Sequence, residues 1–264
     1  MSQLLEGKTA LILGVANRWS LAYAIARAFV RENAHVILTY QGDRQKQTVE
    51  ELAAEIKAHQ VLPCDVTQDA QLDALASNLK DQGTMLNAVV HSIAFANRED
   101  LSRPFVETSR AGFALAHDVS AYSLVAVARA TASLMAPAGQ GGGSFTTLTY
   151  LGSTRVVENY NVMGVAKAAL ESSVRYLAAG LGPSNIRVNA ISAGAVKTTS
   201  ARGIRDFSKM LEEGAKMAPL RRTTDPAEVA DTAVFLASDL GRGVTGNIIY
   251  VDAGAQIMGF ALTE

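Results

Sequence analysis

Cysteine is nearly absent from this sequence, and neither sign of charge dominates it. Cys64 is the only cysteine among 264 residues, so no disulfide can form within the chain. A lone thiol is typical of a reducing compartment, and we expect a cytoplasmic protein. The 24 lysines and arginines are offset by 25 aspartates and glutamates. A net charge of −1 lacks the basic balance of nucleic-acid-binding proteins, so no nucleic acid partner is expected.

Long hydrophobic runs are also missing. No segment approaches the roughly 18 consecutive apolar residues of a membrane-spanning helix. The first apolar stretch, residues 9–15, has the length of a strand, and no basic segment precedes it as in a signal peptide. We therefore expect no membrane partner. A chain of this size also needs no metal to stabilise its core, and no metal site is expected.

The residues that are present, 48% apolar and 19% charged, have the composition of an ordered globular protein. Short apolar runs alternate with longer helical patterns, which favours parallel strands joined by crossover helices. We predict an α/β fold, a single doubly wound (Rossmann-type) domain over residues 1–264, with a mainly parallel sheet of about seven strands and helices on both faces. The predicted strands are Thr9–Leu13, His35–Tyr40, Gln60–Cys64, Ala88–His91, Gly143–Leu148, Arg187–Ile191 and Ile248–Val251. The predicted helices are Leu21–Glu32, Arg44–Ala58, Ala70–Asp81, Phe105–Ala136, Val162–Leu181 and Pro226–Leu236.

Residues 194–222 mix glycine, threonine, serine and charged side chains, and they are long for a connection inside a compact domain. Long connections of this kind often cover a binding site. We therefore expect a substrate loop at about 194–222, with short helical pieces around 204–211.

The loop after the first strand has the setting of a dinucleotide site. Gly14 would let the backbone approach a pyrophosphate, and the helix that follows would offer free N–H groups. Ser20 is a good N-cap whose hydroxyl could also face phosphate. The loop is not a clean G-x-G-x-x-G, so an ordinary capped turn remains the alternative.

Three polar residues stand where later strands end. Gln41, after the second strand, is neither the acid typical of NAD sites nor the base typical of NADP sites, but its amide can bind a sugar hydroxyl. Asp65, after the third strand, could accept from an adenine amino group or simply hold a turn. His91, at the end of the fourth strand, is expected to be structural.

Tyr160 and Lys167 stand at the start of a long helical pattern. Seven residues are almost two turns, so both side chains would share one helix face, about 10 Å apart along the axis. A nearby ammonium favours the phenolate and strengthens the phenol as a hydrogen-bond donor, and it can also bind a ribose hydroxyl. A tyrosine and a surface lysine on an amphipathic helix are the alternative.

Several motifs together resemble one family, the divergent short-chain dehydrogenase/reductases, and within it the bacterial NADH-dependent enoyl-acyl carrier protein reductases. The Tyr-x6-Lys spacing is the specific part, because ordinary members have Tyr-x3-Lys, and here that position is Gly164. The motifs are Gly14-x5-Ser20-x-Ala22, Cys64-Asp65-Val66, His91-Ser92-Ile93, His117-Asp118, Tyr150-x9-Tyr160-Asn161-Val162-Met163-Gly164-x2-Lys167, the segment 187–194 and Val251-Asp252-Ala253-Gly254.

The resemblance implies hydride transfer from NADH to C3 of a trans-2-enoyl thioester in type II fatty acid synthesis. Tyr160 would stabilise the enolate, Lys167 would hold the ribose, and Tyr150 would lie beside the acyl chain, so these three are the expected catalytic residues. Gln41 fits NADH better than NADPH. The implied cofactor-binding residues are Gly14, Ser20, Leu21, Gln41, Asp65, Val66, Ile93, Lys167, Val196, Lys197, Thr198, Thr199 and Ser200. The implied substrate-binding residues are Ala96, Tyr150, Tyr160, Met163, Ile204 and Phe207.

The resemblance further implies that acyl carrier protein bears the substrate and that the protein is a homotetramer. Arg202, Arg205 and Lys209 could receive the acidic carrier, or could be a solvated helix face. Ala94 stands where the family pattern usually has glycine, and Ala195 stands where it usually has proline. The rival hypotheses are another short-chain reductase acting on a ketone or alcohol, and a non-catalytic nucleotide-sensing regulator.

Overall fold

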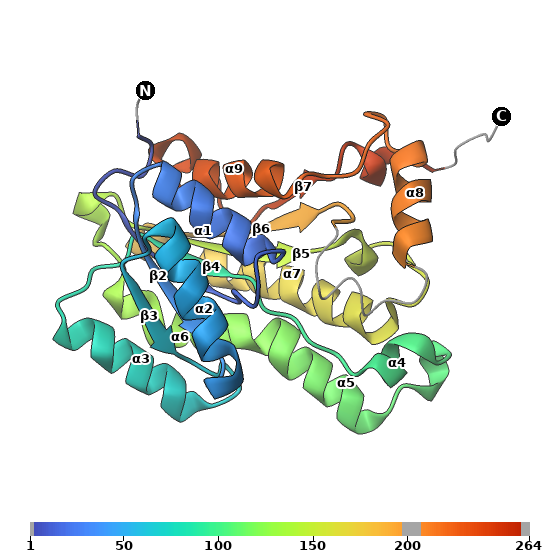
Figure 1. The fold of residues 1–264 in the computed structure, drawn as a ribbon, viewed down its shortest axis with the longest axis horizontal. Helices are drawn as coiled ribbons and strands as arrows, with labels where there is room; N and C mark the ends of the chain where they lie inside the picture. The colour runs from blue at the N-terminus through green and yellow to red at the C-terminus, as the bar shows by residue number, and fades with distance from the viewer. Residues whose placement is uncertain (1–2, 197–206, 260–264) are drawn as a thin grey trace.

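A single parallel sheet forms the centre of the computed structural model, which describes residues 3–196 and 207–259 (Figure 1). Its seven strands lie in the order β3-β2-β1-β4-β5-β6-β7, and every neighbouring pair is parallel. The sheet expected to be mainly parallel is therefore wholly parallel across these pairs. The strands are β1 (Thr9–Leu13), β2 (His35–Tyr40), β3 (Gln60–Pro63), β4 (Ala88–His91), β5 (Gly143–Thr149), β6 (Ile186–Ala193) and β7 (Ile248–Val251).

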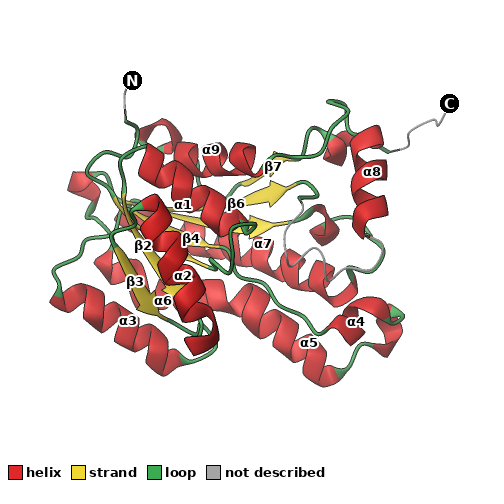
Figure 2. Cartoon of the chain, viewed as in Figure 1, coloured by secondary structure: helices red, strands yellow, loops and turns green. Residues whose placement is uncertain are grey.

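Helices cover both faces of this sheet, as Figure 2 shows. Successive side chains of β1 point to opposite faces, so Ala10 and Ile12 join one core, while Leu11 and Leu13 join the other. Burial on both faces favours an uninterrupted apolar run, and residues 10–13 of β1 form one. The first core includes α1 (Leu21–Arg31), α2 (Asp43–Ile56) and α9 (Pro226–Ala237), and the second α3 (Asp69–Asp81), α6 (Ser123–Thr131) and α7 (Asn161–Leu181).

The predicted strand and helix bounds agree with these elements to within two residues, with one exception. The helix expected over Phe105–Ala136 is wrong as a single element. Ser109 begins a new helix, α5 (Arg110–His117), because its side chain accepts a hydrogen bond from the amide of Gly112. A wide π turn at Asp118–Tyr122 then joins α5 to α6 within one continuous helical stretch. Two further helices, α4 (Arg98–Ser102) and α8 (Phe207–Met217), complete the α-helices of the described residues.

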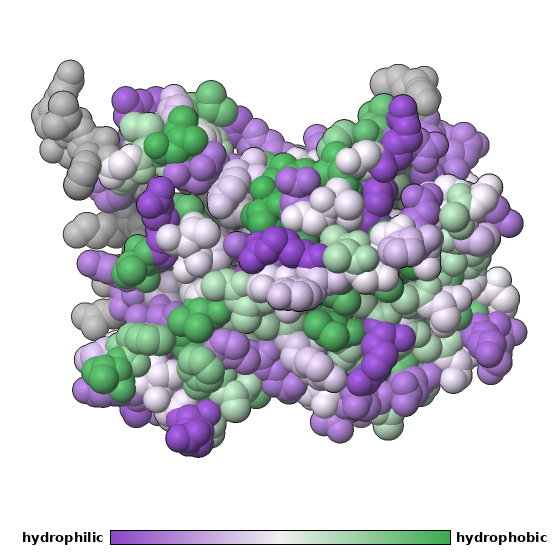
Figure 3. All heavy atoms as spheres, turned by 180° about the vertical axis from the view of Figure 1, so that it is seen from behind, coloured by the Kyte–Doolittle hydropathy of each residue, from purple (hydrophilic) through white to green (hydrophobic). Residues whose placement is uncertain are grey.

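The helical stretch Arg110–Leu134 is long and apolar enough, by length and composition, to cross a membrane, which the apolar runs of the sequence did not indicate. However, 56% of its apolar window is buried inside the protein, and the core helix of a soluble protein passes the same test. Figure 3 shows that the face of the molecule seen from behind mixes hydrophilic and hydrophobic residues. The stretch is therefore weak evidence for a membrane span.

Candidate functional site

A cavity of about 580 Å³ lies at the carboxyl ends of the strands. The strand order reverses between β1 and β4, and ligands of doubly wound sheets bind at this switch point. Residues following β1, β2, β3 and β4 all line the cavity, so the topology gathers four separate loops at one place. Among the residues expected to bind a cofactor, the lining includes Gly14, Ser20, Leu21, Gln41, Asp65, Val66, Ile93 and Lys167.

Gly14 forms part of this lining at a point where no other residue fits. Its φ is +101°, and a Cβ atom there would lie 2.0 Å from the carbonyl oxygen of Ser92, after β4. Glycine alone lets the loop after β1 approach the end of β4 this closely. A bare backbone beside a helix start is the surface that a pyrophosphate needs, so the residues present fit a dinucleotide.

We expect Gly14→Ala to weaken NADH binding at least about tenfold, because the backbone must move away from Ser92 to admit the methyl group. Titration calorimetry with NADH measures the effect. Gly83→Ala is the matched control, since Gly83 also has a positive φ, +67°, but a methyl group there would meet no atom within 4 Å. The control should lower Tm and leave NADH affinity intact; equal affinity loss in both variants would contradict the assignment.

Ser20 precedes α1 as expected, but its side chain makes no capping hydrogen bond. The hydroxyl donates instead to the carbonyl oxygen of Asn17 at 2.7 Å, which holds the loop in a turn. Ser20 is therefore the N-cap residue of α1, as predicted, but without the expected capping hydrogen bond. Because a capping side chain does not occupy the start of α1, the first-turn amides remain available for an anion.

Gln41 and Asp65 meet at the rim of the cavity. The Gln41 amide donates to Asp65 Oδ2 at 3.2 Å, and Oδ1 accepts from both the backbone and the hydroxyl of Thr67. Burial opposes ionisation of the Asp65 carboxyl, but the hydrogen bonds from Thr67 and Gln41 prevail and lower its pKa. The two sequence interpretations of Asp65 are therefore compatible, because the residue holds a turn and also lines the cavity.

His91 is structural, as expected. The ring is completely buried, with Nδ1 2.9 Å from Thr147 Oγ1 and Nε2 2.8 Å from Ser123 Oγ. Burial, together with the charge of Lys167, lowers its pKa to about 3. The imidazole is consequently neutral near pH 7 and does not serve as a proton-transferring group there.

Lys167 reaches the cavity from α7 although only 5% of it is exposed. One of its three N–H donors is directed to the carbonyl oxygen of Leu148 at 2.7 Å. Burial lowers the pKa of the ammonium to about 8, against the opposing effect of Glu171. Lys167 is therefore not the surface lysine of the alternative interpretation.

Tyr160 immediately precedes α7 and packs against Tyr150, with ring centroids 5.0 Å apart and planes at 69°. Two glycines make room for this arrangement. A Cβ on Gly152 would lie 2.4 Å from the Tyr160 ring, and one on Gly164 would lie 2.7 Å from the carbonyl oxygen of Gly152. Gly164, which stands where a Tyr-x3-Lys pattern would have lysine, thus lets the turn at Gly152 lie directly against α7.

The ionisation of Tyr160 differs from the expectation. Burial, and then the neighbouring Tyr150 and Glu171, raise the pKa of its phenol well above the usual value. The expectation that an ammonium would favour the phenolate is wrong in direction, because desolvation disfavours the charged form. Burial also raises the pKa of Tyr150. Both phenols are therefore neutral and able to donate hydrogen bonds.

An apolar cluster beside the start of α7 involves three of the expected substrate-binding residues. Met163 belongs to its buried core, and Ala96 and Tyr160 pack against it. Asn161 ties this region together, because its amide donates to the carbonyl oxygens of Leu101, at 2.9 Å, and Arg103, at 2.7 Å. The structure therefore brings Ala96, Met163 and both tyrosines to one side of α7.

The remaining expected residues lie on or near the substrate loop. Val196 is buried at its start. Lys197, Thr198, Thr199, Ser200, Arg202, Ile204 and Arg205 lie outside the described residues. Phe207 and Lys209 lie in α8, whose first side chains are also outside the description.

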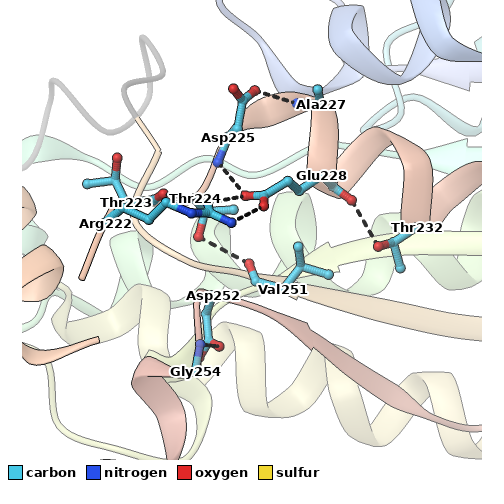
Figure 4. Close-up of polar contacts among 10 residues, drawn as sticks. All are labelled: Arg222, Thr223, Thr224, Asp225, Ala227, Glu228, Thr232, Val251, Asp252 and Gly254. Atoms are coloured by element: carbon cyan, nitrogen blue, oxygen red, sulfur yellow. Dashed lines mark hydrogen bonds and ion pairs between the residues drawn. The ribbon is translucent and has the colours of Figure 1, made fainter. Parts of the chain in front are cut away.

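The two ends of the substrate loop meet beside the end of β7. The amide of Gly194 donates to the carbonyl oxygen of Val251 at 2.8 Å, and the hydroxyl of Thr224 donates to the same oxygen at 3.3 Å. Figure 4 shows the cluster that follows, in which Glu228 accepts from the guanidinium of Arg222 and, at 2.9 Å, from the amide of Asp225. This capping box fixes the start of α9 and thereby one end of the loop.

We expect Glu228→Gln to lower Tm at neutral pH. The bond from Arg222, followed by that from the Asp225 amide, lowers the pKa of Glu228 to about 2 from an ordinary 4.5. A carboxyl with a depressed folded-state pKa stabilises the fold above its unfolded pKa and loses that effect as the pH falls. The Tm difference between variant and wild type should therefore shrink below about pH 4.5; a constant difference in calorimetric scans would contradict this.

Sequence reasoning missed several residues of this site, including the cavity-lining Phe95, Leu115 and Val119 and two residues that support Lys167 and Tyr160. Glu171, one turn after Lys167, is buried and accepts from the hydroxyl of Thr149 at 2.7 Å. Its i+4 spacing from Lys167 was the available signal. Gly152 has no such signal, because its role arises only when the turn after β5 packs against α7.

Comparisons with known proteins agree with this geometry. The model of a family described as Enoyl-(Acyl carrier protein) reductase matches residues 14–256. The NADH enoyl-(acyl carrier protein) reductase FabI of Bacillus cereus is 54% identical over 259 residues, covering 97% of this chain and all of that protein. The FabI of Escherichia coli is 46% identical over 254 residues, covering 96% and 95%.

Solved structures of such reductases superpose closely. The Bacillus cereus reductase, crystallised with NADP+ and an indole naphthyridinone, has a TM-score of 0.94 at 54% identity, covering 97% of this chain and 99% of that chain. The Anaplasma phagocytophilum reductase in complex with NAD also has a TM-score of 0.94, at 41% identity, covering 100% and 99%.

Proposed function

Because the chain belongs to the family of enoyl-(acyl carrier protein) reductases, we propose that the cavity beside Lys167 is the site where a trans-2-enoyl thioester is reduced. The chain is an NADH-dependent oxidoreductase of fatty acid biosynthesis, and acyl carrier protein bears its substrate. When bound, NADH supplies the hydride that adds to C3 of the acyl chain. The observation that carries the proposal is a buried ammonium that reaches the cavity from α7, on the helix whose start lies beside two neutral phenols in contact with each other.

Tyr160 stabilises the negative charge that collects on the thioester oxygen. Its phenol is neutral because burial raises the pKa, so it donates a hydrogen bond rather than presenting a second negative charge. A fixed donor of this kind typically contributes a few kcal/mol in the transition state. Tyr150, whose ring packs against Tyr160, limits the rotation of the phenol and lies beside the acyl chain.

The Lys167 ammonium has three N–H donors, and one of them binds the carbonyl oxygen of Leu148. The others bind the ribose of the cofactor. The loop after β1 and the start of α1 hold the pyrophosphate, and the rim formed by Gln41 and Asp65 holds the adenosine. The cofactor-binding set is Gly14, Ser20, Leu21, Gln41, Asp65, Val66, Ile93, Lys167 and Val196, together with Lys197, Thr198, Thr199 and Ser200.

The acyl chain lies against the apolar cluster of Ala96, Tyr160 and Met163. Residues 194–222 form a loop over the substrate within the single domain 1–264, and Ile204 and Phe207 belong to the substrate-binding set. Anchoring of both loop ends beside β7 supports this arrangement.

The functional assembly is a homotetramer in the cytoplasm, with no nucleic acid or membrane partner. Exposed apolar side chains support self-association, since Tyr176 of α7 is 81% exposed and Phe113 of α5 is 40% exposed. Cys64, a buried free thiol, is compatible with a reducing compartment. Light scattering of the purified protein tests the tetramer.

The deciding experiment is oxidation of NADH and NADPH, in parallel, with crotonyl and dodecenoyl thioesters. We expect turnover with NADH and less with NADPH; both cofactors are needed because the Bacillus cereus structure contains NADP+. Acetoacetyl-CoA is the control substrate. Faster turnover of this ketone would favour another short-chain reductase, and NADH binding without any turnover would favour a nucleotide sensor.

A further inference from the structure

Glu171 is a buried acidic residue that the proposed reaction does not use. It lies one helical turn after Lys167 in α7, and only 6% of it is exposed. Its carboxylate accepts from the hydroxyl of Thr149 at 2.7 Å, while Lys167 Nζ donates to the carbonyl oxygen of Leu148 at the same distance. Two consecutive residues at the end of β5 thus hold the two side chains.

Burying a carboxylate is costly unless it compensates another charge. Residues four apart on a helix have Cβ atoms about 5–6 Å apart, so Glu171 and Lys167 lie on one buried stripe of α7. We infer that Glu171 is a positioning residue, which keeps the Lys167 ammonium charged and directed at the cofactor cavity. The inference rests on the proposed function, because it assigns a second residue to the same site.

The other titratable groups around Lys167 do not supply this charge. His91, on β4, is neutral because burial, reinforced by Lys167, lowers its pKa to about 3. Tyr150 and Tyr160, beside the start of α7, are neutral because burial raises their pKa values. Within the described residues, Glu171 is the acidic group that opposes the loss of the Lys167 proton.

If Glu171 keeps Lys167 charged, replacing Glu171 should change how NADH binding depends on pH. A purely structural role of Glu171 would not produce this change. Burial lowers the pKa of Lys167 to about 8, and Glu171 raises it. Removing the carboxylate charge should therefore make Lys167 lose its proton at a lower pH. Removing only the hydrogen bond from Thr149 should leave the charge of the Glu171 carboxylate in place. The titration midpoint of Lys167 should then stay almost unchanged.

The experiment compares Glu171→Gln, which keeps an acceptor for Thr149, with Thr149→Val, which keeps the carboxylate. Glu50→Gln, which removes an exposed carboxylate from α2, is the control for net charge. Two quantities are measured between pH 6 and about 10: the NADH dissociation constant, and the Lys167 titration followed by NMR with isotopically labelled lysine. Neither needs an enoyl substrate, so failure of the proposed reaction would be recognised separately.

We expect the Lys167 midpoint of Glu171→Gln to fall by about one unit, with NADH binding at pH 8 weakened several-fold. Thr149→Val and Glu50→Gln should keep the wild-type midpoint, and Glu171→Asp should restore it. An unchanged midpoint in Glu171→Gln, or an equal fall in Thr149→Val, would overturn the inference. If Glu171→Gln does not fold, the wild-type titration decides, because a Lys167 midpoint below about 7 would mean that the carboxylate does not hold the charge.

Discussion

Tyr160→Phe is expected to lower the turnover of an enoyl thioester by about 100- to 1,000-fold, with little change in NADH affinity. The substitution removes one oxygen and leaves the ring, which packs at 5.0 Å from Tyr150 and against the turn at Gly152. Only the hydrogen bond to the developing charge is lost, and this bond is strongest in the transition state. Stopped-flow turnover and titration calorimetry measure the two quantities.

Tyr122→Phe is the matched control, because Tyr122 is 45% exposed and its hydroxyl contacts Arg129 rather than the cavity. The control should retain wild-type turnover and NADH affinity. If Tyr160→Phe weakened NADH binding as much as it lowered turnover, the phenol would be a binding group, and its assignment to the thioester oxygen would be wrong.

The sheet could be predicted from the sequence because short strand-length segments alternate with longer helical patterns. Thr9–Leu13 is the clearest case, since residues 10–13 are apolar toward both faces of the sheet, which distinguishes the strand from an amphipathic helix. The failure over Phe105–Ala136 is equally instructive. Helical periodicity continues through that stretch, but a local hydrogen bond at Ser109 starts the helix later, and a π turn at Asp118–Tyr122 widens it between α5 and α6.

The site could be located from sequence but its electrostatics could not. Spacing was enough to place Tyr160 beside the start of the helix that carries Lys167, and Gly14 at a strand end. The ionisation of Tyr160 depends on burial by residues distant in the chain, which is why proximity of an ammonium suggested the wrong direction. The Gly152 contact likewise exists only once the turn packs against α7.

Lys167→Ala is expected to weaken NADH binding about 10- to 100-fold and to lower turnover together with it. Charge-assisted hydrogen bonds of a buried group contribute about 1.5–3 kcal/mol, and about 1.4 kcal/mol corresponds to tenfold in affinity. Wild-type affinity should also decrease as the pH rises through about 8, where the Lys167 ammonium loses its proton, and the variant should lack this transition.

Lys80→Ala, on the exposed side of α3, controls for loss of a positive charge and should bind NADH normally. Calorimetric titrations of all three proteins between pH 6 and about 10 separate the two effects. Because Lys167 Nζ also holds the Leu148 carbonyl, a fall in Tm alone would reflect lost packing. Normal NADH affinity in Lys167→Ala, or a pH transition in affinity that persists in this variant, would contradict the assignment of Lys167 to the cofactor site. The buried charge beside the end of β5 would then have no role in NADH binding.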